Sequence, residues 1–127
     1  MTSIEGLDRR ELGRRGEEWA AAWLTRRGMT ILDANWRCRR GEVDLVARDG
    51  AEVVVVEVKT RRGTSHGHAL EAVTPAKSAR LRALAHAWRE AHPDESGRSR
   101  VDVVGITVAT EHGRVVLDVQ HVRGIGS

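Results

Sequence analysis

Apolar residues recur at helical spacing in a first segment that runs from Asp8 to Gly28. The spacing is typical of one buried helix face and is shared by Leu12, Trp19, Ala20, Trp23 and Leu24. Gly28 suits the position just past a helix end. Glu17 lies along the edge of the inward-facing stripe, whereas Glu18 is rotated by about 100°. The segment is therefore predicted to be a helix that directs one carboxylate, Glu17, toward the core.

A second helical pattern runs from Thr74 to about His92. Thr74 and Pro75 form an N-cap and first-turn pair. The buried stripe of this predicted helix consists of Leu81, Leu84, Ala85 and Trp88. Lys77 extends the same stripe toward the N-terminus, so we expect its side chain to face the sheet rather than open water.

Five other segments have the composition and alternation of β-strands. They cover residues 30–36, 42–48, 51–59, 100–108 and 114–122, with a turn at 111–113 between the last two. The element order is thus αβββαββ, which predicts an α/β fold. Residues 60–69 contain arginines, histidines and glycines, so we expect them to form a basic surface loop.

The dipeptide Asp-Gly at positions 49 and 50 predicts a two-residue type I′ turn between two of these strands. With that loop, Asp44 would oppose Val55 and Glu42 would oppose Glu57. One face of the hairpin would then be apolar, with Val43, Leu45, Val54, Val56 and Val58. The other face would carry Glu42, Asp44, Val55, Glu57 and Lys59. A loop one residue longer would separate Asp44 from Glu57, so the arrangement depends on the turn.

Composition bounds the class of protein. The 127 residues are 40% hydrophobic and 31% charged, which excludes a disordered chain and predicts one domain over residues 1–127 with a core at 8–122. No apolar run could span a bilayer and residues 1–25 have no signal-peptide pattern, so we expect a cytoplasmic protein without a membrane partner. The single cysteine, Cys38, cannot form an internal disulfide, and no Cys/His spacing matches a zinc site.

The net charge of +3 does not by itself indicate a nucleic-acid partner. All but two of the 21 basic residues are arginine, and the exceptions are Lys59 and Lys77. Lysine is a compact charge whose pKa changes when it is buried near other groups, so these two positions stand out. The basic residues expected to contact phosphates are Arg39, Arg40, Arg61, Arg62 and Lys77. An arginine-rich chain also has scattered surface arginines, which is the simpler interpretation.

Three acidic residues on one strand face repel one another unless a cation, a proton or a basic side chain lies between them. Lys59 beside Glu57 would give an ordinary solvent-facing network, which contributes little to stability. However, Asp44 shares the face with both residues, Glu17 projects from the helix, and the following loop is basic. Carboxylate ligands without Cys or His suit Mg²⁺ or Mn²⁺, and such an ion would polarise a phosphodiester. The combination favours phosphodiester hydrolysis.

The motifs of the chain resemble those of the YraN family of small bacterial proteins. They are Gly16-Glu17 with Ala20 and Leu24, Asn35, Gly41-Glu42-Val43-Asp44-Leu45-Val46, Val56-Glu57-Val58-Lys59 with Arg61, Gly67, Glu71-Ala72-Val73, Lys77 and Arg100-Val101-Asp102-Val103-Val104. The similarity covers residues 10–108, and the spacing of GEVDLVA and VEVKTR is specific. The family is similar to a branch of the PD-(D/E)XK nuclease superfamily, close to archaeal Holliday junction resolvases. This resemblance implies a restriction-endonuclease-like fold with a central mixed sheet flanked by helices.

The resemblance also implies roles for individual residues. Asp44 corresponds to the metal-binding aspartate of the superfamily, and Glu57 corresponds to the acidic residue of its second motif. Lys59 matches the catalytic lysine. Glu17 matches the additional helix glutamate of resolvase-like members, and Lys77 stands at a position with an auxiliary polar role.

We therefore expect a nuclease that uses Mg²⁺ or Mn²⁺ to hydrolyse phosphodiester bonds in branched or structured DNA. The ion would be held by Glu17, Asp44, Glu57 and the backbone carbonyl of Val58. Lys59 would act on the attacking water, and Glu42 would be auxiliary. Resolvase-like enzymes also imply a homodimer, because two strands are cut symmetrically. The alternatives are a nucleic-acid-binding module that keeps the nuclease scaffold without cutting, and a structural adaptor with a solvated acidic face.

Overall fold

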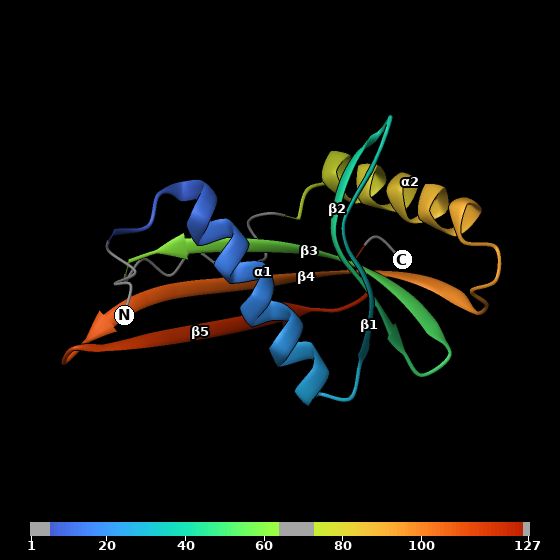
Figure 1. Ribbon diagram of the computed structural model, residues 1–127. Helices are drawn as coiled ribbons and strands as arrows, with labels where there is room; N and C mark the ends of the chain where they lie inside the picture. The colour runs from blue at the N-terminus through green and yellow to red at the C-terminus, as the bar shows by residue number, and fades with distance from the viewer. Residues whose placement is uncertain (1–5, 64–72, 126–127) are drawn as a thin grey trace.

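The computed structural model describes residues 6–63 and 73–125. Its elements follow the predicted order (Figure 1): α1 (Arg9–Arg26), β1 (Thr30–Cys38), β2 (Gly41–Asp49), β3 (Glu52–Arg62), α2 (Pro75–Ala91), β4 (Arg98–Glu111) and β5 (Arg114–Val122). The loop expected at 60–69 begins later than predicted, because β3 continues to Arg62; positions 64–69 of that loop lie outside the described residues. Within the described ranges, no helix is long and apolar enough to cross a membrane.

The five strands form one sheet in the order β1-β2-β3-β4-β5. Neighbouring strands are antiparallel except for β3 and β4, which run parallel with α2 between them in the chain. Figure 1 shows the β1–β2 hairpin standing steeply against β4 and β5, as in a strongly twisted sheet. The predicted restriction-endonuclease-like α/β fold, with a mixed sheet flanked by helices, is confirmed.

Both helices begin and pack as the sequence predicts. The carboxylate of Asp8 caps α1 by accepting a hydrogen bond from the backbone N of Glu11 at 2.8 Å. The hydroxyl of Thr74 caps α2 in the same way, and Pro75 occupies its first turn. The buried side of α1 consists of Leu12, Gly16, Ala20 and Leu24, and that of α2 consists of Ser78, Leu81, Leu84, Ala85 and Trp88.

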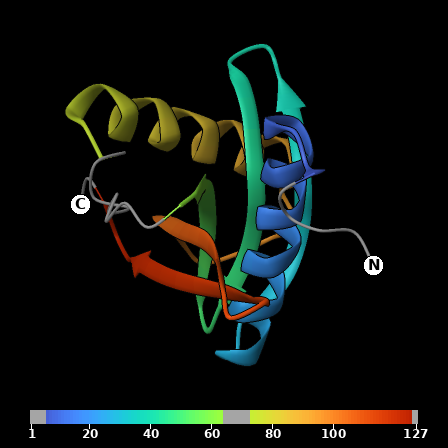
Figure 2. The same cartoon turned by 90° about the vertical axis from the view of Figure 1, so that its left-hand side faces the viewer.

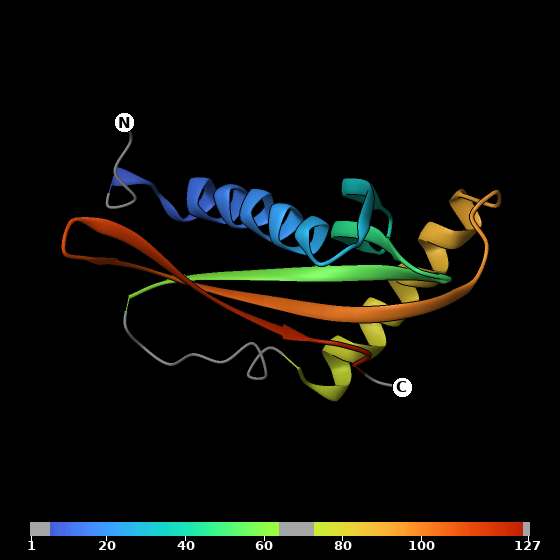
Figure 3. The same cartoon turned by 90° about the horizontal axis from the view of Figure 1, so that it is seen from below.

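The two helices lie on opposite sides of the sheet (Figures 2 and 3). Val54 and Val56 of β3 pack in the core under α1, whereas Val53 and Val55 pack in the core under α2. Both sides of β3 are therefore buried at its middle. The prediction of one apolar and one polar hairpin face is wrong, because Val55 lies on the side that α2 covers. A parallel strand pair joined by a helix is normally covered in this way.

The turn between β2 and β3 also differs from the prediction. Its loop residues are Gly50 and Ala51, and Asp49 pairs with Glu52. Only Gly50 of the two has a positive φ, 58°, as a type II′ turn requires, so the predicted type I′ turn is wrong. Asp49 remains in the strand, where its carboxylate accepts a hydrogen bond from Arg100 at 2.9 Å. The strand register is consequently shifted by two residues.

Candidate functional site

The candidate site forms where β2 separates from β3. The regular pairing of the two strands ends at Leu45 and Val56, so Asp44 comes next to Glu57. At this point the side chain of Asp44 replaces the backbone of β2 as the partner of β3. Its Oδ2 accepts a hydrogen bond from the backbone N of Val58 at 2.8 Å. This bond fixes the carboxylate against the strand that carries Glu57.

Two pairings predicted for this region are wrong. Glu42 does not oppose Glu57, and Asp44 does not oppose Val55. Glu42 instead pairs with Arg37 of β1, whose Nε lies 3.6 Å from Glu42 Oε1 on the exposed surface. In a regular hairpin a shift of two residues would leave each side chain on its original side, and the charge of Glu57 acts on Asp44 in the structure. The expected proximity of Asp44 and Glu57 therefore remains, although the turn that predicted it was wrong.

Side-chain alternation along β2 breaks at Asp44. Val43 packs in the core under α2, whereas Leu45, two residues further on, packs in the core under α1. In a regular strand these two side chains would point to the same side. Asp44 thus lies at an irregular position, from which it interacts with Glu17 of α1 and with Glu57, whose ion-pair partners are on α2.

Helix α1 approaches β3 closely enough to bring Glu17 to this position. A Cβ atom added at Gly16 would lie 1.7 Å from Oγ1 of Thr60, so the contact requires glycine. Glu17 follows directly, half-buried at the edge of the inward-facing stripe, as the sequence predicts. Asn35 of β1, with a φ of 53°, forms a hydrogen bond with Glu17. Neither Gly16 nor Asn35 was predicted to have these roles, although a glycine inside a helix is a signal of close packing.

Burial raises the pKa of Asp44 to about 6. The hydrogen bond from Val58 lowers this pKa, but the negative charges of Glu57 and Glu42 raise it further. The positive charge of Lys77 opposes them without restoring the ordinary value. Asp44 is therefore a carboxylate that the folded protein holds in an unfavourable, negatively charged environment.

Burial also raises the pKa of Glu17, to about 7. The negative charge of Asp44 raises the pKa of Glu17 further, and so does the charge of Glu42. The hydrogen bond from Asn35 lowers it.

We refer to Glu17, Glu42, Asp44 and Glu57 as the carboxylate cluster. Of the described residues, no basic side chain forms an ion pair with Glu17 or Asp44.

Glu57 differs from the other members, because two basic side chains of α2 hold it. Lys77 Nζ lies 2.8 Å from Glu57 Oε2, and Arg80 Nη2 lies 3.6 Å from Glu57 Oε1. Lys77 faces the sheet, as its place on the helix stripe predicts. The contact of Arg80 was not predicted, because it depends on how α2 lies across β3.

Lys59 is exposed near the outer end of β3. It lines a hollow of about 580 Å³ together with Arg9 and Gly13 of α1 and Arg61 and Arg62 of β3. Arg62 also donates a hydrogen bond to the backbone carbonyl of Leu7. A second hollow, of about 610 Å³, contains Glu17, Asn35 and Glu42 and shares Arg9 and Gly13 with the first. Lys59 and Glu17 therefore line adjacent hollows on the two sides of α1's first turns.

Arg39 and Arg40 form the exposed turn between β1 and β2. This turn is close to α2, because a Cβ at the adjacent Gly41 would lie 3.8 Å from Leu84. In Figures 1 and 3 the turn and the outer end of β3 lie far apart. The structure thus places the predicted phosphate-contacting arginines in two separate groups, and Lys77 in neither.

Two members of the carboxylate cluster could hold a metal ion. In residues 6–63 and 73–125, no group of three or more His, Cys, Asp or Glu side chains is arranged to hold a metal ion. Glu17 and Asp44 nevertheless suit a hard cation, because both are oxygen donors, both are desolvated and the charge of Asp44 raises the pKa of Glu17. Glu57 is the exception, since Lys77 already neutralises it. The cluster fits a divalent ion through two carboxylates, and through a third if Glu57 leaves Lys77.

Comparison with known proteins identifies relatives that span most of the chain. Residues 16–106 match a family described as "Uncharacterised protein family UPF0102". A "UPF0102 protein" of Clavibacter michiganensis subsp. michiganensis is 58% identical over 96 residues, which cover 76% of this chain and 81% of the relative. One of Kineococcus radiotolerans is 56% identical over 115 residues, covering 90% and 92%. One of Acidothermus cellulolyticus is 51% identical over 126 residues, covering 91% and 93%.

Proposed function

Since the chain belongs to the UPF0102 family, which is the YraN family of the PD-(D/E)XK superfamily, we propose that its carboxylate cluster is the centre of a metal-dependent nuclease. The observation that carries the proposal is the placement of Glu17 of α1 and Asp44 of β2 side by side in a partly buried position, with Glu42 and Glu57 near them, which raises the pKa of both groups. Two desolvated carboxylates side by side lower the stability of a fold unless something binds between them. Such perturbed groups are typical of functional sites, and a divalent cation would remove the repulsion.

Glu17 and Asp44 would hold Mg²⁺ or Mn²⁺, joined by Glu57 and by the backbone carbonyl of Val58. When bound, the ion would neutralise charge on a phosphodiester and lower the pKa of a water molecule. The hydrogen bond from Val58 N already fixes the orientation of Asp44 before any ligand arrives. Lys77 would take a positioning role, because it neutralises Glu57 in the absence of a cation and must release it for Glu57 to become a ligand.

Lys59 would act on the substrate. Its ammonium group is exposed in the hollow beside α1, where it would orient the attacking water or neutralise charge that develops on the phosphate. Arg61 and Arg62 follow on the same strand and would contact the DNA backbone. Arg39 and Arg40, at the separate β1–β2 turn, would contact a second arm of a branched or structured DNA.

The test is cleavage of labelled single-stranded, duplex, flap and four-way-junction DNA in Mg²⁺, in Mn²⁺ and in EDTA. We expect ion-dependent cleavage by the wild-type protein and a loss of at least about 100-fold in Asp44→Asn and in Lys59→Ala. Glu18→Gln is the matched control, since it removes a neighbouring carboxylate from the exposed side of α1. Undiminished cleavage by folded Asp44→Asn would contradict the proposal.

The second candidate is a nucleic-acid-binding module that keeps the nuclease scaffold without cutting. The ion pairs of Lys77 and Arg80 with Glu57 favour it, because they leave the carboxylate cluster one ligand short. DNA binding that falls steeply with salt, that needs no divalent ion and that leads to no cleavage would support this candidate.

A further inference from the structure

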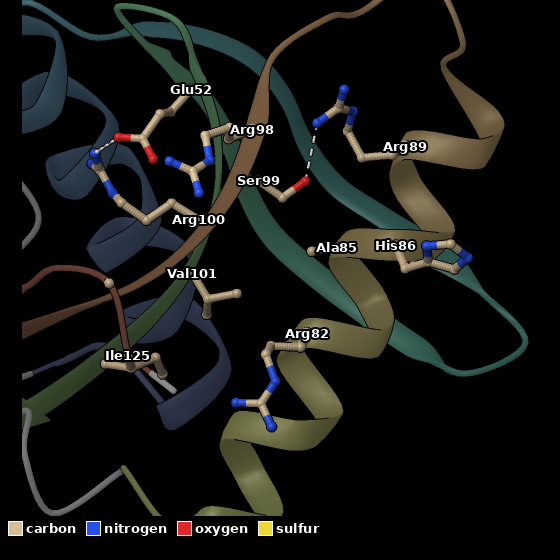
Figure 4. Close-up of a pocket in the computed structure, with 11 residues that line it drawn as sticks. Glu52, Arg82, Ala85, His86, Arg89, Arg98, Ser99, Arg100, Val101 and Ile125 are labelled. Atoms are coloured by element: carbon tan, nitrogen blue, oxygen red, sulfur yellow. Dashed lines mark hydrogen bonds and ion pairs between the residues drawn. The ribbon is translucent and has the colours of Figure 1, made fainter. Parts of the chain in front are cut away.

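A cavity of about 660 Å³ lies on the α2 side of the sheet, apart from the carboxylate cluster. Its apolar lining is formed by Ala85 of α2, Val101 of β4 and Ile125 near the C-terminus. Arg82 and Arg89 of α2 line it, and so do Arg98 and Arg100 of β4, whose side chains point away from α2 in Figure 4. We call this cavity, with its four arginines, the arginine pocket. Its size is within the range of small-molecule sites.

The four arginines differ in how their charge is balanced. Arg100 is neutralised by Asp49, Glu52 and Asp102, which lie 2.9 to 3.0 Å from its nitrogen atoms. Glu52, the carboxylate that lines the pocket, is thereby engaged.

Arg89 is held without being neutralised. Its guanidinium donates to the carbonyl of Gly97 at 2.8 Å, to the hydroxyl of Ser99 at 3.0 Å and to the carbonyl of Glu95 at 3.1 Å. All three acceptors are uncharged groups, so the guanidinium is fixed in place while its positive charge remains. Preorganised charge of this kind favours an anion.

Arg82 and Arg98 add two exposed guanidinium groups at the rim. Arg98 forms no ion pair with any residue that the structure describes. Because Arg89 and Arg98 keep their charge among the described residues, the pocket combines an apolar floor with an excess of positive charge. Guanidinium groups match phosphate oxygens in geometry, and the floor suits the base or the sugar attached to a phosphate.

We propose that the arginine pocket binds a nucleotide through its phosphate group. The nucleotide is either free or part of a DNA strand, since both present the same chemistry. This site is independent of the carboxylate cluster and requires no metal ion. It is also separate from the arginines that the sequence predicted to contact phosphates.

The test measures binding in EDTA of two probes, adenosine monophosphate by calorimetry and a short fluorescein-labelled single-stranded DNA by anisotropy. We expect the double variant Arg82→Gln/Arg98→Gln to weaken binding about tenfold and to reduce the dependence of binding on salt concentration. Arg26→Gln, an exposed arginine of α1, is the control and should bind as the wild type does. Binding of the monophosphate would identify a free nucleotide, and binding of the DNA alone would identify a strand.

Failure of both probes to bind, or unchanged binding by the double variant, would overturn the proposal. Asp44→Asn separates it from the nuclease proposal. That variant should bind both probes normally even though it loses cleavage, so either proposal can fail without the other.

A different observation concerns the outer edge of the sheet, which β5 forms. Among the described residues, the large hydrophobic side chains that are exposed are Val115, Val116 and Leu117, at 51%, 39% and 36%. Figures 1 and 3 show the β4–β5 hairpin extending beyond the first turns of α1, so neither helix covers its tip. An uncovered apolar edge strand is a site for pairing with another strand.

The hydrogen-bonding direction of this strand follows from its turn. His112 and Gly113 have φ values of 51° and 74°, as a type I′ turn requires, and Glu111 pairs with Arg114. In such a hairpin alternate residues bond to the neighbouring strand. Val115 and Leu117 therefore direct their backbone N–H and C=O groups outward to the open edge.

The sequence of β5 is complementary to itself in the antiparallel direction. A two-fold axis through Val116 would pair Val115 with Leu117 of a second copy, whose outward backbone groups match. The same axis would pair Arg114 with Asp118 of the second copy, twice. We infer that β5 pairs with β5 of a second copy, which joins the two sheets into one.

Sedimentation velocity in EDTA and without DNA tests this inference. We expect the wild-type protein to form a dimer and Val116→Glu, which places two carboxylates at the axis, to be a monomer. Arg114→Asp should also dissociate the dimer, and adding Asp118→Arg should restore it. Thr110→Glu, an exposed change on β4 of the same hairpin, is the control. A wild-type monomer at high concentration, or a dimer that survives Val116→Glu, would overturn the inference.

Discussion

The carboxylate cluster and the ion network around Asp102 both place acidic side chains inside the sheet, but they balance charge differently. Asp102 is fully buried and accepts hydrogen bonds from Arg100 Nε at 2.9 Å, from His121 Nε2 at 2.8 Å and from the backbone N of Gly124 at 2.9 Å. Asp44 accepts a hydrogen bond from the backbone N of Val58, and its side-chain neighbours include the acids Glu17, Glu42 and Glu57.

The two environments shift pKa values in opposite directions. Burial alone would raise the pKa of Asp102, but the hydrogen bonds from His121, Arg100 and Gly124 outweigh it and hold the pKa below its usual range. For Asp44 burial prevails, and the pKa rises to about 6. A balanced network stabilises the folded protein, whereas an unbalanced one lowers its stability and is typical of a site kept for a ligand. The contrast gives Asp102 a structural role and supports the proposed ligand-binding role of the carboxylate cluster.

The largest effect is expected from Asp102→Asn. The substitution leaves the buried Arg100 and His121 without their shared carboxylate, so the free energy of unfolding should fall by about 3 kcal/mol. Urea denaturation at neutral pH measures it. Asp94→Asn, in the exposed loop before β4, is the control and should change stability by less than about 0.5 kcal/mol. If Asp102→Asn and Asp94→Asn were equally stable, the network around Asp102 would not stabilise the folded protein.

A smaller loss of stability is expected when a substitution moves α1 away from the carboxylate cluster. In Gly16→Ala the new Cβ would collide with Oγ1 of Thr60, so unfolding free energy should fall by about 2 kcal/mol. In Gly13→Ala, on the same helix, no atom lies within 4 Å of the new Cβ, and stability should rise by about 0.5 kcal/mol. Urea denaturation of both variants compares the same substitution at a position packed against β3 and at one that is not. Similar changes in stability would mean that α1 does not pack closely against β3 at Gly16.

The sequence alone predicts the parts of this contrast that depend on local chemistry. The apolar spacing predicts both helices and the cap Thr74 predicts where the second begins, because each signal acts within one or two turns; the cap Asp8 was not predicted. The turn between β2 and β3 was not predictable in the same way. Asp49 stays in the strand and pairs with Arg100 and Arg123, which are distant in sequence, so the register depends on tertiary contacts.

The same limit applies to the site. Its acidic residues could be proposed from their motifs and spacing, yet the balance of charge around them could not. Glu57 is neutralised by Lys77 and Arg80 only because α2 crosses the sheet there. Within the described residues neither Glu17 nor Asp44 forms an ion pair with α2, and the charge of Lys77 lowers the pKa of Asp44 without restoring its ordinary value. Burial, which is the largest cause of the raised pKa values, is likewise a property of packed layers rather than of a motif.

The pH dependence of stability should separate the two clusters. The pKa of Asp44 is raised from 3.8 to about 6, so the folded protein holds this proton to higher pH than the unfolded chain does. Its contribution to unfolding free energy therefore falls as pH rises from about 4 to about 6. Asp44→Asn should be more stable than wild type by about 1.5 kcal/mol at about pH 8, and no more stable at about pH 4.

Urea denaturation across this range measures the difference between the two proteins. Asp102 has the opposite dependence, because its lowered pKa means that its stabilisation is lost as pH falls, but it is present in both proteins and cancels. Parallel curves for wild type and Asp44→Asn would contradict the unbalanced charge on which the proposed site rests.

The smallest expected effect is the stabilisation of the folded protein when a cation binds the carboxylate cluster. An ion that binds only the folded protein raises the free energy of unfolding, by about 1 kcal/mol at about five times its Kd. We expect Mn²⁺ to do so above the pKa values of Asp44 and Glu17, and less at lower pH, where protons compete for the same oxygens. Thermal unfolding with Mn²⁺ and with EDTA measures it. Mn²⁺ should stabilise Glu18→Gln as it does the wild type, and it should not stabilise Asp44→Asn. If Mn²⁺ stabilised both variants equally, the ion would bind elsewhere, and the carboxylate cluster would be left without the ligand that explains its charge.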